Sequence, residues 1–84
     1  MVGQITAYVL MKIDIGSTED VVDKLRLIEK ANKIAVTTGE FDVIVRLEVD
    51  SLEELYDITV RKIHSIRGIR ETTTAVVEKM VTTP

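Results

Sequence analysis

Apolar residues occupy every second position from residue 4 to residue 13: Ile5, Ala7, Val9, Met11 and Ile13. This period of two is typical of a strand that buries one face. The same alternation recurs later in the chain at Phe41, Val43, Val45, Leu47 and Val49. It predicts a second strand over residues 41–49, which is the clearest strand of the chain.

Two stretches show helical spacing instead. After Gly16, the apolar positions are Val21, Val22, Leu25 and Ile28. With Ser17 or Thr18 as the N-cap, they predict an amphipathic helix of about three turns. Ser51 and Glu54 form a capping box that opens a second helix. We expect that helix to present Leu52, Leu55, Thr59 and Ile63 on one face and to end before Gly68.

Two further strands complete the pattern. Residues 34–38 read as a short strand that turns at Gly39-Glu40 into the strand over residues 41–49. Residues 69–80, rich in Thr and Val, predict the last strand. The order β-α-β-β-α-β predicts an α+β ferredoxin-like sandwich, with a four-stranded antiparallel sheet and two helices on one face. A length of 84 residues suits one domain over residues 1–84.

Composition excludes several classes of function. The formal net charge of −3 argues against a nucleic-acid surface, which depends on clustered Lys and Arg. The sequence has no cysteine for a disulfide or a thiolate metal site. It also has no run of about 20 apolar residues for a membrane span and no recognisable signal peptide. We therefore expect a cytoplasmic protein with no membrane or direct nucleic-acid partner.

The face of the predicted sheet opposite the helices is apolar. Its expected members are Tyr8, Leu10, Ile44, Val76 and Met80. A contiguous apolar patch of this kind is typical of a subunit interface. The alternative is a set of scattered surface residues, which needs no explanation. We expect a homodimer that pairs two sheets face to face, with the closed symmetry that most homo-oligomers adopt.

The sequence offers little for catalysis. His64 is the only histidine, and no carboxylate or serine stands near it in a recognisable catalytic pattern. Tyr8 and Tyr56 are expected to be packing residues. Metal-ligand spacings and a glycine-rich phosphate loop are both absent from the sequence. We predict no catalytic residue, no metal and no cofactor.

Two local features suggest a binding site. In residues 38–42, the carboxylate of Asp42 stands beside a tight turn, where backbone N–H groups can be free. In residues 70–74, Thr72 and Thr74 point to the same side as Val76. Taken separately, each has a simpler explanation: Asp42 can stabilise the turn, and threonine favours strands.

Together, these motifs resemble a known family. The motifs are Thr38-Gly-Glu-Phe-Asp42, Ser51-Leu-Glu-Glu-Leu55, Ser65-Ile-Arg-Gly-Ile69 and Glu71-Thr-Thr-Thr74. Their order and spacing resemble the effector domain of the Lrp/AsnC transcription regulators, also called the RAM domain (regulation of amino-acid metabolism). The resemblance extends over essentially the whole chain.

The resemblance implies a ferredoxin-like fold, dimers formed through the sheet, and rings of dimers that are often octamers. It also implies amino-acid effectors bound in clefts between dimers. Carried over to this sequence, the ligand-binding residues are Gly39, Glu40, Phe41, Asp42, Thr72 and Thr74. Turn amides near Gly39 would receive the ligand carboxylate, and Asp42 would pair with its ammonium group. Threonine hydroxyls of a neighbouring subunit would complete the shell.

The sequence departs from the family pattern in two ways. Family members usually carry a DNA-binding helix-turn-helix before this domain, whereas here the first strand begins almost at Met1. The chain therefore resembles the stand-alone form of the domain, or an excised fragment, and could join full-length relatives through the same interface. Arg67 stands where the family often has proline, which affects the loop before the last strand.

Three functions are compatible with these observations. The first is a non-enzymatic amino-acid sensor that assembles with itself. The second is a small enzyme of the dimeric α+β barrel type, such as a cofactor-free monooxygenase or a muconolactone-isomerase-like protein, using His64 and Tyr8. The third is a structural oligomerisation module without a ligand.

Overall fold

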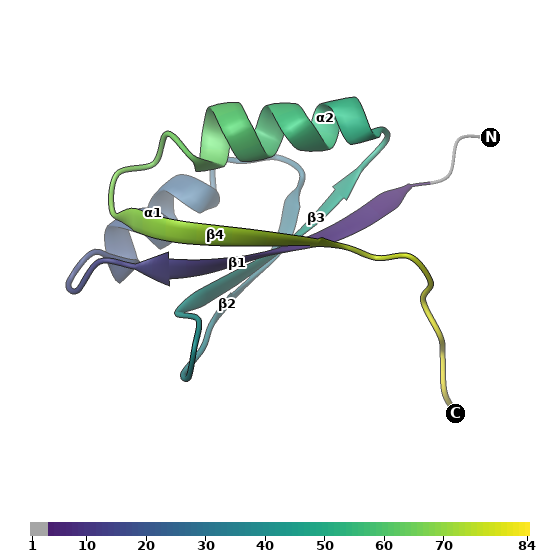
Figure 1. Cartoon of the computed structure of the whole chain (residues 1–84), viewed down its shortest axis with the longest axis horizontal. Coiled ribbons are helices and arrows are strands. Elements are labelled where there is room, and N and C mark those ends of the chain that lie inside the picture. The colour runs from purple at the N-terminus through teal and green to yellow at the C-terminus, as the bar shows by residue number, and fades with distance from the viewer. Residues whose placement is uncertain (1–3) are drawn as a thin grey trace.

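The computed structural model describes residues 4–84 and confirms the predicted fold class. Its strands are β1 (Ile5–Ile13), β2 (Ala31–Val36), β3 (Val43–Val49) and β4 (Ile69–Val76). They form one sheet in the order β2-β3-β1-β4, and every neighbouring pair is antiparallel. Figure 1 shows the helices gathered on one side of this sheet. The arrangement is the ferredoxin-like sandwich.

The core lies between the sheet and the helices. Alternate side chains of the two central strands point into it: Ala7, Val9, Met11, Ile13, Val43, Val45, Leu47 and Val49. All are fully or almost fully buried, so the period-two prediction for β1 and β3 is confirmed. The helices contribute Val21, Leu25, Leu55, Ile58 and Ile63 to the same cluster.

The first helix, α1 (Thr18–Leu25), has eight residues and is shorter than predicted. Ser17 is its N-cap, but its side chain accepts no capping hydrogen bond. After α1 the chain continues through turns, in which the Ile28 amide bonds to the Leu25 carbonyl at 3.1 Å. Ile28 is nevertheless buried in the core, so the prediction that it faces inward is confirmed.

The second helix (residues 52–63) begins as α2 (Leu52–Tyr56) and continues as the π-helix η1 (Asp57–Ile63). The predicted cap is present: Ser51 Oγ accepts from the Glu54 amide at 3.0 Å, and Glu54 Oε1 accepts from the Asp50 amide at 2.8 Å. The prediction that Leu52 shares one face with Leu55, Thr59 and Ile63 is wrong, because those three are buried and Leu52 is 63% exposed. The π-helix, which the sequence did not predict, ends with the His64 amide bonded to the Thr59 carbonyl at 3.0 Å.

Several strand boundaries also differ from the prediction: β2 ends at Val36 rather than at residue 38, and β3 begins at Val43 rather than at residue 41. β2 begins at Ala31 rather than at residue 34, and the Glu48 amide already bonds to the Lys30 carbonyl there. β4 ends at Val76 rather than at residue 80, after which the Val77 amide makes one more bond to the Thr6 carbonyl. Beyond that bond the chain runs away from the sheet (Figure 1). In the described residues, no helix is both long and apolar enough to cross a membrane.

Candidate functional site

The hairpin between β2 and β3 is closed by hydrogen bonds at its base. The Thr37 amide donates to the Asp42 carbonyl at 2.9 Å, and Thr37 Oγ1 donates to the Phe41 carbonyl at 2.7 Å. Gly39 lies at the exposed tip with φ +107°, a conformation that L side chains rarely adopt. The predicted site residues Gly39 and Glu40 are therefore exposed, whereas Phe41 is half-buried.

Asp42 connects the hairpin to the central strand. Its Oδ2 accepts from the Ile13 amide at 2.7 Å, and its own amide donates to the Met11 carbonyl at 2.9 Å. The pairing of β1 with β4 shifts between Lys12 and Ile13, at this end of β1. The carboxylate is half-buried and held in one orientation by the Ile13 amide. One of its two oxygens thus has a structural role, while a carboxylate retains further acceptor positions.

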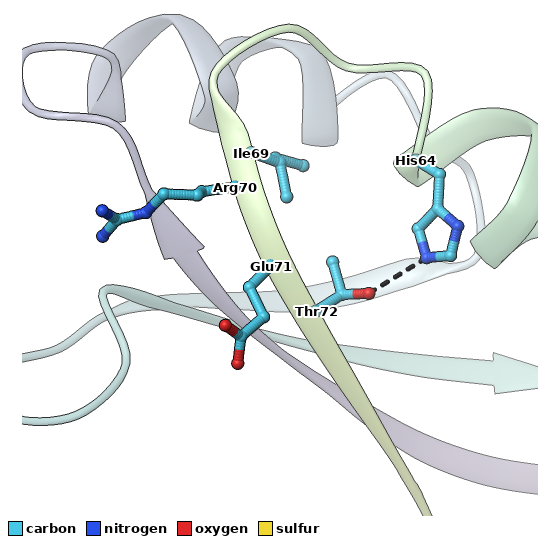
Figure 2. Close-up of a pocket in the computed structure, with 5 residues that line it drawn as sticks. All are labelled: His64, Ile69, Arg70, Glu71 and Thr72. Carbon is cyan, nitrogen blue, oxygen red and sulfur yellow. Dashed lines mark hydrogen bonds between the residues drawn. The ribbon is translucent and has the colours of Figure 1, made fainter.

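Thr72 and Thr74 lie on the edge strand β4. The register pairs Thr72 with Met11 and Thr74 with Val9, so both occupy the face that the helices cover. Thr72 Oγ1 lies 3.0 Å from His64 Nε2, at the end of the second helix. Figure 2 shows the Thr72 hydroxyl directed at the imidazole. The sequence motif includes Thr72 but does not predict its contact with His64, because that contact depends on how the end of the second helix packs against β4.

A shallow depression of about 250 Å³ adjoins this contact. It is lined by His64, Ile69, Arg70, Glu71 and Thr72. The side chains of Arg70 and Glu71 point away from His64 (Figure 2). The lining contains no residue of the hairpin.

The two halves of the predicted site therefore flank β1 in a single chain. Met11 pairs with Val43, next to Asp42, on one side and with Thr72 on the other. Since neighbouring strands are about 4.8 Å apart, β3 and β4 are separated by about 10 Å. The two halves stand at the same end of the sheet without forming one pocket.

The open face of the sheet carries three of the five residues predicted there. Tyr8, Leu10 and Ile44 lie on it, with Leu10 paired to Ile44 across β1 and β3. Beside Tyr8 and Ile44 is a depression of about 390 Å³, whose lining includes Ala35 and Arg46. Arg46 Nε is buried and has no hydrogen-bond partner among residues 4–84.

The placement of Val76 and Met80 on the open face is wrong. Val76 pairs with Ala7, whose side chain is in the core, so Val76 lies on the helix-covered face. Met80 lies beyond the end of β4 and is 58% exposed. The β4 residues on the open face are Thr73, opposite Leu10, and Ala75, opposite Tyr8. The register of β4 on β1 therefore determines which of its alternate residues lie on the open face.

The residues proposed for catalysis do not converge. Tyr8 lies on the open face, between the buried Ala7 and Val9, whereas His64 contacts Thr72 on the helix-covered face. Among residues 4–84, no group of three or more His, Cys, Asp or Glu side chains is arranged to hold a metal ion. Within one chain, Tyr8 and His64 therefore do not share a site.

Comparisons with known proteins agree with one another. The family model for the Lrp/AsnC ligand binding domain matches residues 6–83. The HTH-type transcriptional regulator FL11 of Pyrococcus furiosus is 30% identical over 76 residues, which cover 90% of this chain and 50% of that protein. The chain thus spans about half the length of the curated relatives it matches.

Solved structures show the same fold. FFRP-DM1 is 32% identical, with a TM-score of 0.83 and coverage of 87% of this chain and 97% of that one. The transcriptional regulator NMB0573 of Neisseria meningitidis, solved as a complex with L-methionine, is 17% identical, with a TM-score of 0.88. The match covers 98% of this chain and 54% of that one.

Proposed function

The chain belongs to the Lrp/AsnC ligand-binding domain family, and from this premise we propose that it binds an amino-acid effector and self-associates without catalysing a reaction. The observation that carries the proposal is the divided arrangement of the candidate site. An oriented carboxylate, Asp42, and the hydroxyl of Thr72 flank the same end of β1 on different strands. Since these groups flank β1 rather than line one pocket, the proposal is that they complete one shell where two copies of the chain meet.

The ligand chemistry follows from the groups present. A free amino acid carries an ammonium group, which a carboxylate such as Asp42 binds through charge-assisted hydrogen bonds. Its carboxylate accepts from donors such as the amides of the exposed hairpin tip around Gly39 and Glu40. Threonine hydroxyls both donate and accept. The complex of NMB0573 with L-methionine shows an amino acid bound by a protein of the same fold.

Self-association through the open face is supported by two features of that face. Tyr8, Leu10 and Ile44 form an apolar surface at the centre of the sheet. Arg46 Nε is buried there with no partner among the described residues. Leaving a buried donor unsatisfied costs about 1–3 kcal/mol. A second sheet packed on this face would bury the apolar side chains and could offer Arg46 an acceptor.

This function relates the chain to transcription control. The curated relatives are transcriptional regulators twice as long, so we propose that effector-dependent assembly regulates transcription or amino-acid metabolism in the cytoplasm. Rings of dimers and co-assembly with full-length regulators are part of the proposal. Native mass spectrometry of the chain mixed with such a regulator tests co-assembly, which is refuted if only separate oligomers form.

The test of effector binding uses a substitution that preserves the structural role of Asp42. Asp42→Asn keeps an oxygen that can accept from the Ile13 amide but removes the charge that would bind an ammonium group. Wild type and variant are compared in a thermal-shift panel of the amino acids, with unrelated small acids as controls. A ligand at 100 times its Kd raises the free energy of unfolding by about 2.7 kcal/mol. For a domain of this size, each kcal/mol raises the melting temperature by roughly 4–8 °C.

We expect a shift with one or a few amino acids that Asp42→Asn abolishes. The matched control is Asp23→Asn on the exposed surface of α1, which removes the same charge away from the hairpin and should leave the shift intact. A panel without any shift would refute effector binding. A shift retained in Asp42→Asn would refute the ammonium role while leaving binding itself in place.

A further inference from the structure

The depression beside His64 is polar. Of the side chains that line it only Ile69 is apolar, and the others are His64, Arg70, Glu71 and Thr72. Arg70 and Glu71 carry opposite charges, and Figure 2 shows both directed away from the imidazole. The groups that the depression offers to a ligand next to Thr72 are therefore the imidazole and the hydroxyl. Their hydrogen bond decides which of them can donate to a ligand.

The Thr72 hydroxyl has a single hydrogen to donate. Its Oγ1 lies 3.0 Å from His64 Nε2. A neutral imidazole with its hydrogen on Nδ1 takes the hydrogen of Thr72, which leaves the hydroxyl able only to accept from a ligand. In the protonated imidazole, Nε2–H donates to Thr72 instead, and the hydroxyl hydrogen is free for a ligand oxygen. Protonated His64 thus makes Thr72 a donor and adds a positive charge beside it.

Positive charge prevails around this contact. Residues 58–70 contain no Asp or Glu but carry Arg61, Lys62, Arg67 and Arg70. Two carboxylates balance part of this charge: Asp57 is paired with Arg61 at 3.2 Å, and Glu71 lines the depression. Lys62 and Arg67 belong to none of the ion pairs within residues 4–84. An anionic ligand group is therefore favoured at this end of β4.

The ligand group that reaches Thr72 is the effector side chain. In the proposed site, Asp42 binds the ammonium group and the hairpin amides bind the α-carboxylate, which are the two groups common to all amino acids. The half of the site at His64 and Thr72 then meets the part in which amino acids differ. Its polar lining suits a side chain with hydrogen-bond acceptors better than an apolar one.

We propose that His64 is a selectivity residue of the effector site, which positions the Thr72 hydroxyl as a donor and favours an amino acid with a carboxylate side chain. This inference rests on the proposed effector binding. Glutamate and aspartate are the amino acids of this class. The protonated imidazole and the hydroxyl that it orients would bind their side-chain carboxylate through charge-assisted hydrogen bonds.

Effector affinity should then depend on pH. Histidine is the side chain whose charge changes between about pH 5 and 8. Since the acidic effector prefers protonated His64, its affinity is highest at the low end of this range and falls as the pH rises. By the same linkage, a bound acidic effector holds the proton on His64 to higher pH.

Isothermal titration of glutamate, aspartate, glutamine and asparagine at about pH 5.5 and about pH 8 tests the selectivity. The wild type is compared with His64→Gln, which keeps a hydrogen-bonding group near Thr72 but gains no charge in this range. The matched control is Lys62→Gln, which removes a fixed charge from the same exposed helix end and should keep the pH dependence. Circular dichroism verifies that each variant is folded.

We expect the better acidic amino acid to bind more tightly than its amide at low pH, and at least about fivefold more weakly at high pH than at low pH. His64→Gln should remove this pH dependence. A role of His64 that is only structural, anchoring the helix end to β4, would not produce it. The inference is overturned if an amide or an apolar amino acid binds more tightly than both acidic ones, or if His64→Gln retains the pH dependence.

Nuclear magnetic resonance gives a second measurement that needs no variant. His64 is the only histidine of the chain, so its imidazole signals are unambiguous in a sample without a histidine tag. Saturating glutamate or aspartate should move the midpoint of its titration upward by at least about 0.7 pH unit, which is the same fivefold coupling. An unmoved midpoint with the ligand bound would overturn the role of His64 and leave effector binding in place. If no amino acid binds at either pH, effector binding itself is refuted, and this inference with it.

Discussion

Substitution of Gly68 by alanine should destabilise the fold more than alanine at another glycine of the same conformation. Gly68 precedes β4 at φ +103°, and its carbonyl accepts from the Asp14 amide at 2.8 Å. A Cβ atom built at this position lies 2.9 Å from Ser17 Cβ and 3.2 Å from Val21 Cγ2. The backbone conformation at position 68 is one that L side chains rarely adopt, and the surrounding atoms leave no space for a Cβ.

The expected cost has two parts. Holding a non-glycine residue in a sparsely populated backbone region costs about 1–3 kcal/mol. Forcing an additional methyl group into a packed site costs about another 1–3 kcal/mol. Gly16 isolates the first part, because its φ is +86° and a Cβ there meets nothing within 4 Å. Gly68→Ala should thus lower the free energy of unfolding by about 1–3 kcal/mol more than Gly16→Ala does.

Equilibrium urea unfolding of the two variants and the wild type measures this difference. All three are compared at one protein concentration, because association stabilises the folded state. The slope of the unfolding free energy with urea is about 1–3 kcal/mol per molar, so the midpoint of Gly68→Ala should lie well below that of Gly16→Ala. Equal midpoints would show that the loop before β4 shifts to accommodate the methyl group without energetic cost, which would refute the packing argument.

Two further substitutions test the local structure. Ser51→Ala removes the oxygen that accepts from the Glu54 amide, and it should lower the free energy of unfolding by about 1 kcal/mol. Ser51→Asp can restore the acceptor and should recover most of that loss. If Ser51→Asp recovers none of it, the capping role of Ser51 is contradicted. Leu47→Ala empties a fully buried position and should cost about 2–5 kcal/mol by chemical denaturation. The exposed Leu27→Ala is its control, and comparable losses from both would contradict the assignment of the core.

The fold could be predicted because β1 and β3 alternate strictly between core and open positions. On such strands a shift by one residue would expose the whole apolar set, so the pattern determines which face is buried. β4 offers no such pattern, since threonine and valine suit either face and much of this edge strand is exposed. The side of Val76 depends instead on its pairing with Ala7, which is a contact between distant parts of the chain.

The second helix shows another limit of sequence patterns. Leu55, Thr59 and Ile63 have the spacing of an ordinary α-helix, and all three are buried as predicted. The change to π-helical hydrogen bonding, seen in the bond from the His64 amide to Thr59, leaves no trace in the positions of apolar residues. Local spacing therefore predicted the buried side of the helix but not its winding.

The candidate site was predictable in its residue types but not in its connections. The motif around Gly39 and Asp42 could be recognised from the sequence, whereas the bond from the Ile13 amide to Asp42 depends on how β1 and β3 meet. The contact between His64 and Thr72 likewise joins a helix end to an edge strand. These links are set by tertiary packing, and the first of them gives Asp42 a structural role beside the ligand role that we propose for it.

The most direct test of the account is a complementation experiment with two defective variants. Asp42→Asn should remove the ammonium partner, and Thr72→Val/Thr74→Val should remove the hydroxyls. If the site is shared between copies, some sites of a mixed oligomer combine Asp42 from one copy with intact threonines from another. After random mixing, about one quarter of all sites should be intact in this way.

Isothermal titration with the amino acid found in the panel measures those sites. The account predicts no binding by either variant alone and binding at roughly one quarter of the wild-type stoichiometry after the two are unfolded together and refolded. Absence of binding in the mixed oligomer, with each variant inactive and folded, would contradict a site shared between copies.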